Sequence, residues 1–103
     1  MTLKDSNSGR VCVSIVSHGH CDMLPLLLCQ LSAKCKDVGH VILTFNLRSD
    51  LRIDVASYPF TVTILENAAP QGFGANHNQA FRLCQHPYFC VLNPDVQIRE
   101  DPF

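Results

Sequence analysis

Four short polar segments carry most of the residues that could do chemistry in this chain. Each comes directly after an apolar run. They are Ser17-His18-Gly19-His20, Asn46, Glu66-Asn67 with the glycine-containing loop that follows, and Asn93-Pro94-Asp95. Hydroxyl, imidazole, amide and carboxylate groups bind polar ligands and cations. Their recurrence after each apolar run indicates one shared binding site.

Asp95 is the side chain best suited to hold a metal ion. Apart from Glu66, it is the only carboxylate near the end of an apolar run. One carboxylate alone binds Mg²⁺ or Mn²⁺ poorly, but it suffices when phosphate oxygens of a substrate complete the coordination. An ordinary Asn-Pro turn accounts for the same residues, so both interpretations stay open at this point.

The glycine-containing loop runs from Gly72 through Gly74 to His77. A dinucleotide-binding fingerprint is excluded because His77 stands at the third glycine position, and no phosphate loop with Gly-Lys-Ser/Thr occurs. The loop is either an anion site made of backbone N–H groups at a helix start or a turn that glycines merely shape. Asn76 and Asn78 are poor helix formers, so we expect one of them to have a hydrogen-bonding task, and His77 to lie in the core.

Potential zinc ligands cluster in His18-Gly19-His20-Cys21, but their spacing matches no common structural zinc site. A metal-binding module built on them is a minor alternative. The six cysteines do not suggest disulfides either, because most of them fall in apolar surroundings (Cys12 and Cys90 in apolar runs, Cys29 and Cys84 on apolar helical positions). Free cysteines there act as small hydrophobic residues. We therefore expect a reduced, cytoplasmic protein.

The elements that must position these groups alternate between strand and helix. Strands are predicted over 11–16, 41–45, 61–65 and 88–92. A first helix, with Asp22 at its N-cap, presents Leu24, Leu27, Leu28 and Leu31 on one face, and Gly39 ends this segment. A short helix is predicted within 47–57. A further helix carries Phe73, His77, Phe81 and Cys84 on its apolar face.

This alternation predicts an α/β fold: a Rossmann-like parallel sheet with strand order 3-2-1-4 and helices on both faces. In such sheets a ligand binds beyond the C-terminal strand ends, where the strand order reverses. The polar segments all follow strands and so belong to that end of the sheet, and we expect the ligand to bind between the first and fourth strands.

Composition bounds the class of protein. The chain has 103 residues, enough for one small domain, with 1–10 as a flexible lead-in and 11–103 as the folded unit. A net charge of -1 excludes a protein that mainly coats nucleic-acid phosphates. No apolar stretch reaches the roughly 18 residues of a membrane span, and the polar N-terminus lacks the core of a secretory signal.

Three segments together resemble the N-terminal half of the inverting family 2 glycosyltransferases, which have the GT-A fold. They are VCVSIVSHGH, NAAPQGFGANHNQAF and YFCVLNPDV, and the resemblance extends from about Val11 to Phe103. GFGANHN is similar to the family's asparagine-rich turn. LNPD is similar to its DxD-type signature with Asn93 at the first Asp, a version familiar in the branch of rhamnosyltransferases and galactofuranosyltransferases.

The resemblance implies a UDP- or dTDP-sugar as ligand, with Asp95 holding Mg²⁺ or Mn²⁺ against the diphosphate. The loop after the first strand would touch the nucleotide, and Asn46 would read the base. The residues assigned in this way to the nucleotide sugar are Ser17, His18, Gly19, His20, Asn46, Asn67, Gly72, Phe73, Gly74, Asn76 and Asn93.

The family places the acceptor site and the catalytic base in a second half. This chain has eight residues after Asp95, so we expect a donor-binding half-domain that does not transfer sugar alone. A non-catalytic nucleotide-sugar binding module is the alternative. Membrane contact is expected only through an acceptor. The fourth strand is expected at a sheet edge, which predicts self-association.

Overall fold

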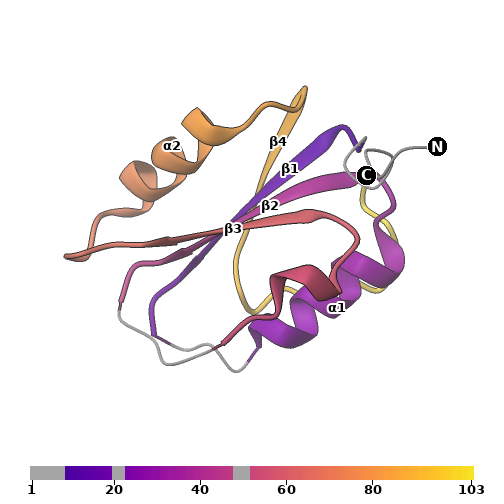
Figure 1. The fold of residues 1–103 in the computed structure, drawn as a ribbon, viewed down its shortest axis with the longest axis horizontal. Helices are drawn as coiled ribbons and strands as arrows, with labels where there is room; N and C mark the ends of the chain where they lie inside the picture. Colours follow the sequence, from indigo (N-terminus) through magenta and orange to yellow (C-terminus); the bar gives the residue numbers. More distant parts are fainter. Residues whose placement is uncertain (1–8, 20–22, 48–51) are drawn as a thin grey trace.

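The computed structural model describes residues 9–19, 23–47 and 52–103, and it shows alternating strands and helices (Figure 1). Both α-helices have 11 residues. The elements in chain order are β1 (Val11–Ser17), α1 (Leu24–Lys34), β2 (Val38–Phe45), the 3₁₀ turn η2 (Val55–Ser57), β3 (Thr61–Glu66), α2 (Phe73–Leu83) and β4 (Tyr88–Leu92).

The four strands form one parallel sheet in the order β3-β2-β1-β4, which confirms the predicted topology. Val13 pairs with Val41 on one side and with Cys90 on the other. The two central strands are buried along almost their whole length, as the near-continuous apolar runs predict. β2 begins three residues before the predicted start, so Gly39 is a buried strand residue rather than the end of the preceding segment.

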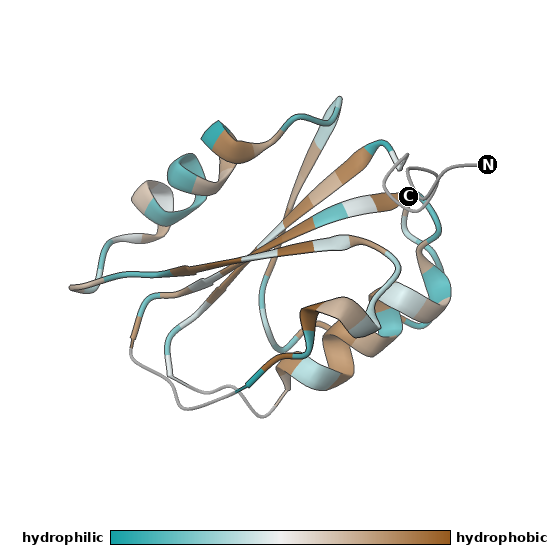
Figure 2. Ribbon diagram, viewed as in Figure 1, coloured by the Kyte–Doolittle hydropathy of each residue, from teal (hydrophilic) through white to brown (hydrophobic). Residues whose placement is uncertain are grey.

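Helices cover both faces of the sheet, as predicted (Figure 1). α1 packs with alternate residues of β1 and β2 in the larger core, which includes Val13, Ile15 and Leu43. On the other face a small cluster of Cys12, Ile42 and Ala80 lies under α2. Figure 2 accordingly shows hydrophobic residues along the central strands and α1, and a more mixed α2.

α1 buries the predicted leucine face. Leu24, Leu27, Leu28 and Leu31 are all at most 1% exposed, which is worth about 1.5–3 kcal/mol for each side chain. Cys29, predicted on an apolar position, is exposed, because it lies on the solvent side between these leucines. Met23 occupies the N-cap without a side-chain hydrogen bond; the predicted cap, Asp22, lies outside the described residues.

α2 faces the sheet with a different stripe from the one predicted. Phe73 and Phe81 are 61% and 58% exposed, whereas Asn76, His77 and Ala80 are buried. The burial of His77 confirms the prediction for that residue, whereas the predicted face misses Asn76, which buries a polar group that has hydrogen-bond partners in the chain. Phe81 instead meets Phe89 of β4 edge-on at a centroid distance of 5.2 Å.

The prediction of a short helix within 47–57 is wrong for the described residues of this range, in which only Val55–Ser57 are helical and form a single 3₁₀ turn. Positions 48–51 lie outside the described residues. The turn is local: the Asp54 carboxylate accepts from Ala56 N, and Ser57 Oγ donates to Asp54 O. Val55 is 41% exposed, so the apolar spacing that suggested a helix does not correspond to a buried face.

The segment after β4 turns back along α1 (Figure 1). Ile98 is buried in the larger core, and its N–H donates to Gln30 Oε1 at 2.7 Å. Lys34 Nζ donates to Arg99 O at 2.8 Å. β4 remains an edge strand of the described sheet, with β1 as its only strand neighbour there.

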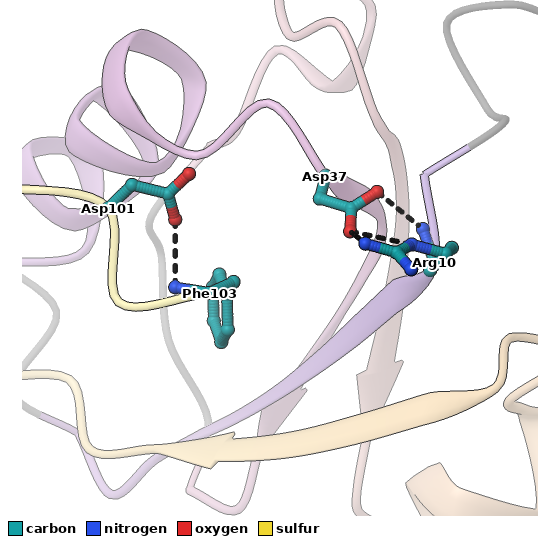
Figure 3. Close-up of polar contacts among 4 residues, drawn as sticks. All are labelled: Arg10, Asp37, Asp101 and Phe103. Carbon is teal, nitrogen blue, oxygen red and sulfur yellow. Dashed lines mark hydrogen bonds and ion pairs between the residues drawn. The ribbon is translucent and has the colours of Figure 1, made fainter.

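At the opposite end of the sheet, Arg10 forms a salt bridge and hydrogen bonds with Asp37 (Figure 3). The Arg10 backbone N and side-chain Nε donate to the carboxylate at 3.1 and 3.0 Å. These hydrogen bonds lower the pKa of Asp37. A Cβ at Gly9 would collide with the backbone of Asp37 and Gly39. Gly9 and Arg10, the last residues of the expected lead-in, therefore pack against the folded unit.

The described cysteines are free thiols: Cys12, Cys29, Cys35, Cys84 and Cys90. Burial, and secondarily Cys84, raises the pKa of Cys12 to about 12. Neither described helix is long and apolar enough to cross a membrane.

Candidate functional site

The C-terminal ends of the strands lie side by side along one edge of the sheet. Ser17 pairs with Phe45, and Phe45 pairs with Glu66, so β1, β2 and β3 end level with one another. Leu92, the last residue of β4, pairs with Ile15 of β1. The polar segments that follow the strands therefore meet along this edge.

Asn46 is the centre of a hydrogen-bonded network at this edge. It is only 4% exposed. Its Oδ1 accepts from Gln71 N at 2.7 Å and from Asn67 Nδ2 at 2.9 Å. Its Nδ2 donates to Gln71 O at 2.9 Å and to His18 Nδ1 at 3.0 Å. These bonds use both lone pairs and both protons of the amide, so Asn46 holds the surrounding loops in place and has no group left over for a ligand.

Asn67 and Asn76 extend the network to α2. Asn67 Nδ2 also donates to Asn76 Oδ1 at 2.6 Å, and Asn76 Nδ2 donates to Gln71 O at 3.2 Å. Asn76 is fully buried, and its amide is hydrogen-bonded through both Oδ1 and Nδ2. It is therefore the helix asparagine that has the expected hydrogen-bonding role. Asn67 keeps its Oδ1 without a partner among the described residues.

The loop after β1 requires a glycine. Gly19 has a φ of +101°, which residues with a Cβ rarely adopt. Ser17 is fully buried in the strand, and its carbonyl accepts from Asn46 N at 2.8 Å. His18 is exposed and faces a cavity. His20, the fourth predicted residue of the loop, lies outside the described residues.

A cavity of about 430 Å³ opens between the ends of β1 and β4. We call it the β1–β4 cavity. Four of the predicted site residues line it, namely His18, Phe73, Asn93 and Asp95, together with Val16, Met23, His77 and Pro94. Asp95 is exposed and has no hydrogen-bond or ion-pair partner among the described residues.

A second cavity, of about 340 Å³, lies at the ends of β2 and β3. Its lining includes Asn46, Glu66 and Asn67, together with Phe45, Leu47, Ala68 and Pro70. We call it the β2–β3 cavity. The hydrogen bond from Asn46 Nδ2 to His18 Nδ1 links the lining of one cavity to that of the other.

The glycines of the loop before α2 are not explained by backbone strain. Gly72 is the N-cap in an extended conformation, and Gly19 is the one described glycine with positive φ. A Cβ on Gly72 or Gly74 would meet nothing within 4 Å. The N-terminus of α2 is thus open to solvent, and a ligand has room to approach its free N–H groups.

His77 is a cavity residue that the sequence prediction assigned to the core. It is 7% exposed, and its Nδ1 lies 2.8 Å from the Oγ of the fully buried Ser14. Phe73 packs edge-on against its ring at 4.5 Å. Burial, and secondarily His18, lowers the pKa of His77. The alternation of β1, which puts the polar Ser14 under α2, is the sequence signal that could have revealed this contact.

No three His, Cys, Asp or Glu residues in the described part of the chain are placed to hold a metal ion by themselves. The zinc alternative also depended on His20 and Cys21, which lie outside that part. A cation at Asp95 would need most of its ligands from a bound molecule, as expected for Mg²⁺ or Mn²⁺ with a diphosphate.

Comparison with protein-family models, with curated proteins and with solved structures finds no match to this chain.

Proposed function

We propose that this chain binds a nucleotide-diphosphate sugar at the C-terminal ends of its strands, as the donor-binding part of a GT-A glycosyltransferase resembling inverting family 2. The observation that carries the proposal is the pair of cavities at this edge. One is lined by a free carboxylate and two imidazoles, the other by amide and carboxylate oxygens. A diphosphate next to a nucleoside needs this combination of neighbouring sites.

In this proposal the diphosphate occupies the β1–β4 cavity. Phe73, at the start of α2, lines that cavity, so the free N–H groups and positive dipole end of α2 lie beside it. The open space at Gly72 and Gly74 leaves room for phosphate oxygens to approach the backbone. A cation held by Asp95 would supply positive charge on the departing diphosphate.

The nucleoside occupies the β2–β3 cavity. Asn67 Oδ1 and the Glu66 carboxylate are acceptors there that have no partner in the part of the chain that the structure describes, and both suit N–H or O–H groups of a base or ribose. Asn46, which the family resemblance assigns to the base, contributes by holding Asn67, His18 and the Gln71 backbone in position.

Calorimetry with UDP and dTDP, with and without Mg²⁺ or Mn²⁺, tests the proposal. We expect metal-dependent binding that Asp95→Asn weakens roughly 10- to 100-fold, as losses in metal sites usually do. Glu100→Gln is the matched control, because Glu100 is an exposed carboxylate of the same segment that does not line the β1–β4 cavity. Metal-independent binding that Asp95→Asn leaves unchanged would remove the metal assignment, and absence of nucleotide binding would refute the function.

A further inference from the structure

The backbone of Gln71 fixes the orientation of the Asn46 amide. A backbone N–H can only donate and a carbonyl oxygen can only accept. Gln71 N lies 2.7 Å from Asn46 Oδ1, and Gln71 O lies 2.9 Å from Asn46 Nδ2. The oxygen and nitrogen of this amide are therefore distinguished by their partners.

This orientation in turn fixes the proton on His18. Asn46 Nδ2 donates its second proton to His18 Nδ1 at 3.0 Å. Nδ1 is then an acceptor, and a neutral imidazole must carry its proton on Nε2. Because His18 lines the β1–β4 cavity, it supplies an Nε2–H donor at that cavity.

His77 is held from the other side by a buried hydroxyl, which can donate to the ring or accept from it. Its Nδ1 is occupied by Ser14 Oγ at 2.8 Å, and Ser14 is fully buried in β1. Its Nε2 has no partner among the described residues, and the ring lines the β1–β4 cavity. Edge-on packing of Phe73 at 4.5 Å restricts rotation of the ring.

We propose that His18 and His77 act as a pair of imidazoles that contacts the anionic, phosphate-bearing part of the ligand in the β1–β4 cavity, with Asn46 and Ser14 as their positioning residues. Taking this anion to be the diphosphate of a nucleotide rests on the function proposed above.

Two further observations favour this pair. Among the residues that the structure describes, no lysine or arginine lines the β1–β4 cavity, so of these lining side chains only the imidazoles and the Asn93 amide can donate to phosphate oxygens. Burial, and secondarily the nearby His18, lowers the pKa of His77, which is consistent with a His77 ring that faces the same cavity as His18.

Binding of inorganic pyrophosphate and of UDP, each with Mg²⁺, tests the pair by calorimetry. We expect His18→Ala and His77→Ala each to weaken pyrophosphate binding roughly tenfold. His18→Gln should recover part of the loss, since its Oε1 accepts from Asn46 while its Nε2 donates into the cavity. The matched control is His86→Gln, because His86 belongs to the connection before β4, at the other end of the sheet.

The two ligands separate the pair from the proposed function. If UDP binds and neither His18→Ala nor His77→Ala weakens pyrophosphate binding, the pair is overturned and nucleotide binding stands. If pyrophosphate binding depends on both histidines and UDP binds no more tightly than pyrophosphate, the pair is supported and the nucleotide assignment fails.

Imidazole ¹⁵N spectra of the unmutated chain give a readout that a folding defect cannot imitate. We expect the proton of neutral His18 on Nε2, and shifts at Nε2 of both His18 and His77 when pyrophosphate is added. Asn46→Asp should move the His18 proton to Nδ1, since a carboxylate only accepts. A free protein with Nδ1 of His18 protonated, or a His77 signal that pyrophosphate does not move, would overturn the assignment.

Discussion

Replacing Asn46 by Ala should destabilise the fold more than a substitution near the protein surface usually does. The change removes four hydrogen bonds, each worth a net ~1 kcal/mol. Water can reach the exposed Gln71 and the half-buried Asn67, which reduces the sum. We expect a loss of about 2–4 kcal/mol in the free energy of unfolding. This loss is a large part of the total, since a typical domain is stable by roughly 5–15 kcal/mol.

Urea unfolding followed by circular dichroism measures this loss. The matched control is Asn78→Ala, because Asn78 is exposed on α2 and its side chain has no hydrogen-bond partner among the described residues. That substitution should be neutral or slightly stabilising, since Ala has the higher helix propensity. A loss for Asn46→Ala below about 1 kcal/mol, or equal to that of the control, would refute the network as a set of formed, mutually supporting hydrogen bonds.

Four further outcomes are expected. Gly9→Ala should cost about 1–3 kcal/mol of stability in urea unfolding, because its Cβ would meet the backbone of β2 and the residue before it; an unchanged midpoint would contradict this packing. Gly74→Ala should leave stability intact, since its Cβ enters open space, but weaken UDP binding in calorimetry; unchanged binding would mean that no ligand approaches there. Burial lowers the pKa of His40 and of His77 in the folded chain from 6.5, so the unfolded chain takes up these protons first. The contribution of these two groups to the free energy of unfolding should therefore be complete above pH 6.5 and decrease as the pH falls toward the folded pKa values. The decrease should be smaller in His40→Gln. Unfolding that does not depend on pH between about 7 and 5, the range where histidine titrates, would contradict this expectation. Light scattering should show self-association that grows with concentration, because β4 is an edge strand; a monomer throughout would contradict it.

The fold was predictable because its signals are strong and local. The apolar runs of β1 and β2 and the leucine spacing of α1 each have a single simple interpretation, and alternation of strand and helix then leaves few topologies. α2 was misplaced in rotation, because its buried stripe contains Asn76 beside the predicted His77, while Phe73 and Phe81 are exposed. A hydrophobic pattern cannot anticipate which polar residue will find a buried partner.

The site was predictable as an edge of the sheet but not as a set of contacts. That Asn46, Asn67 and His18 lie together follows from parallel strands ending level. That Asn46 uses its whole amide on Gln71, Asn67 and His18 depends on how the loop before α2 folds back. Backbone partners carry no signal in residue type, which is why Gln71 was missed.

The segment after β4 has a consequence for motion at Asp95. Five residues, 93–97, span the gap between the last residue of β4, paired with β1, and Ile98, which is hydrogen-bonded to Gln30 of α1 across 68 positions of the chain. The anchor of this segment consists of the Ile98 hydrogen bond, the buried Ile98 side chain, the partly buried Val96 and the Lys34–Arg99 hydrogen bond, so we expect it to open at lower free energy than the sheet does. Slow amide exchange at Ile98 would then report the closed segment, and its opening would free Asp95 to move while β4 stays paired, so that the reach of this carboxylate would be adjustable independently of the fold.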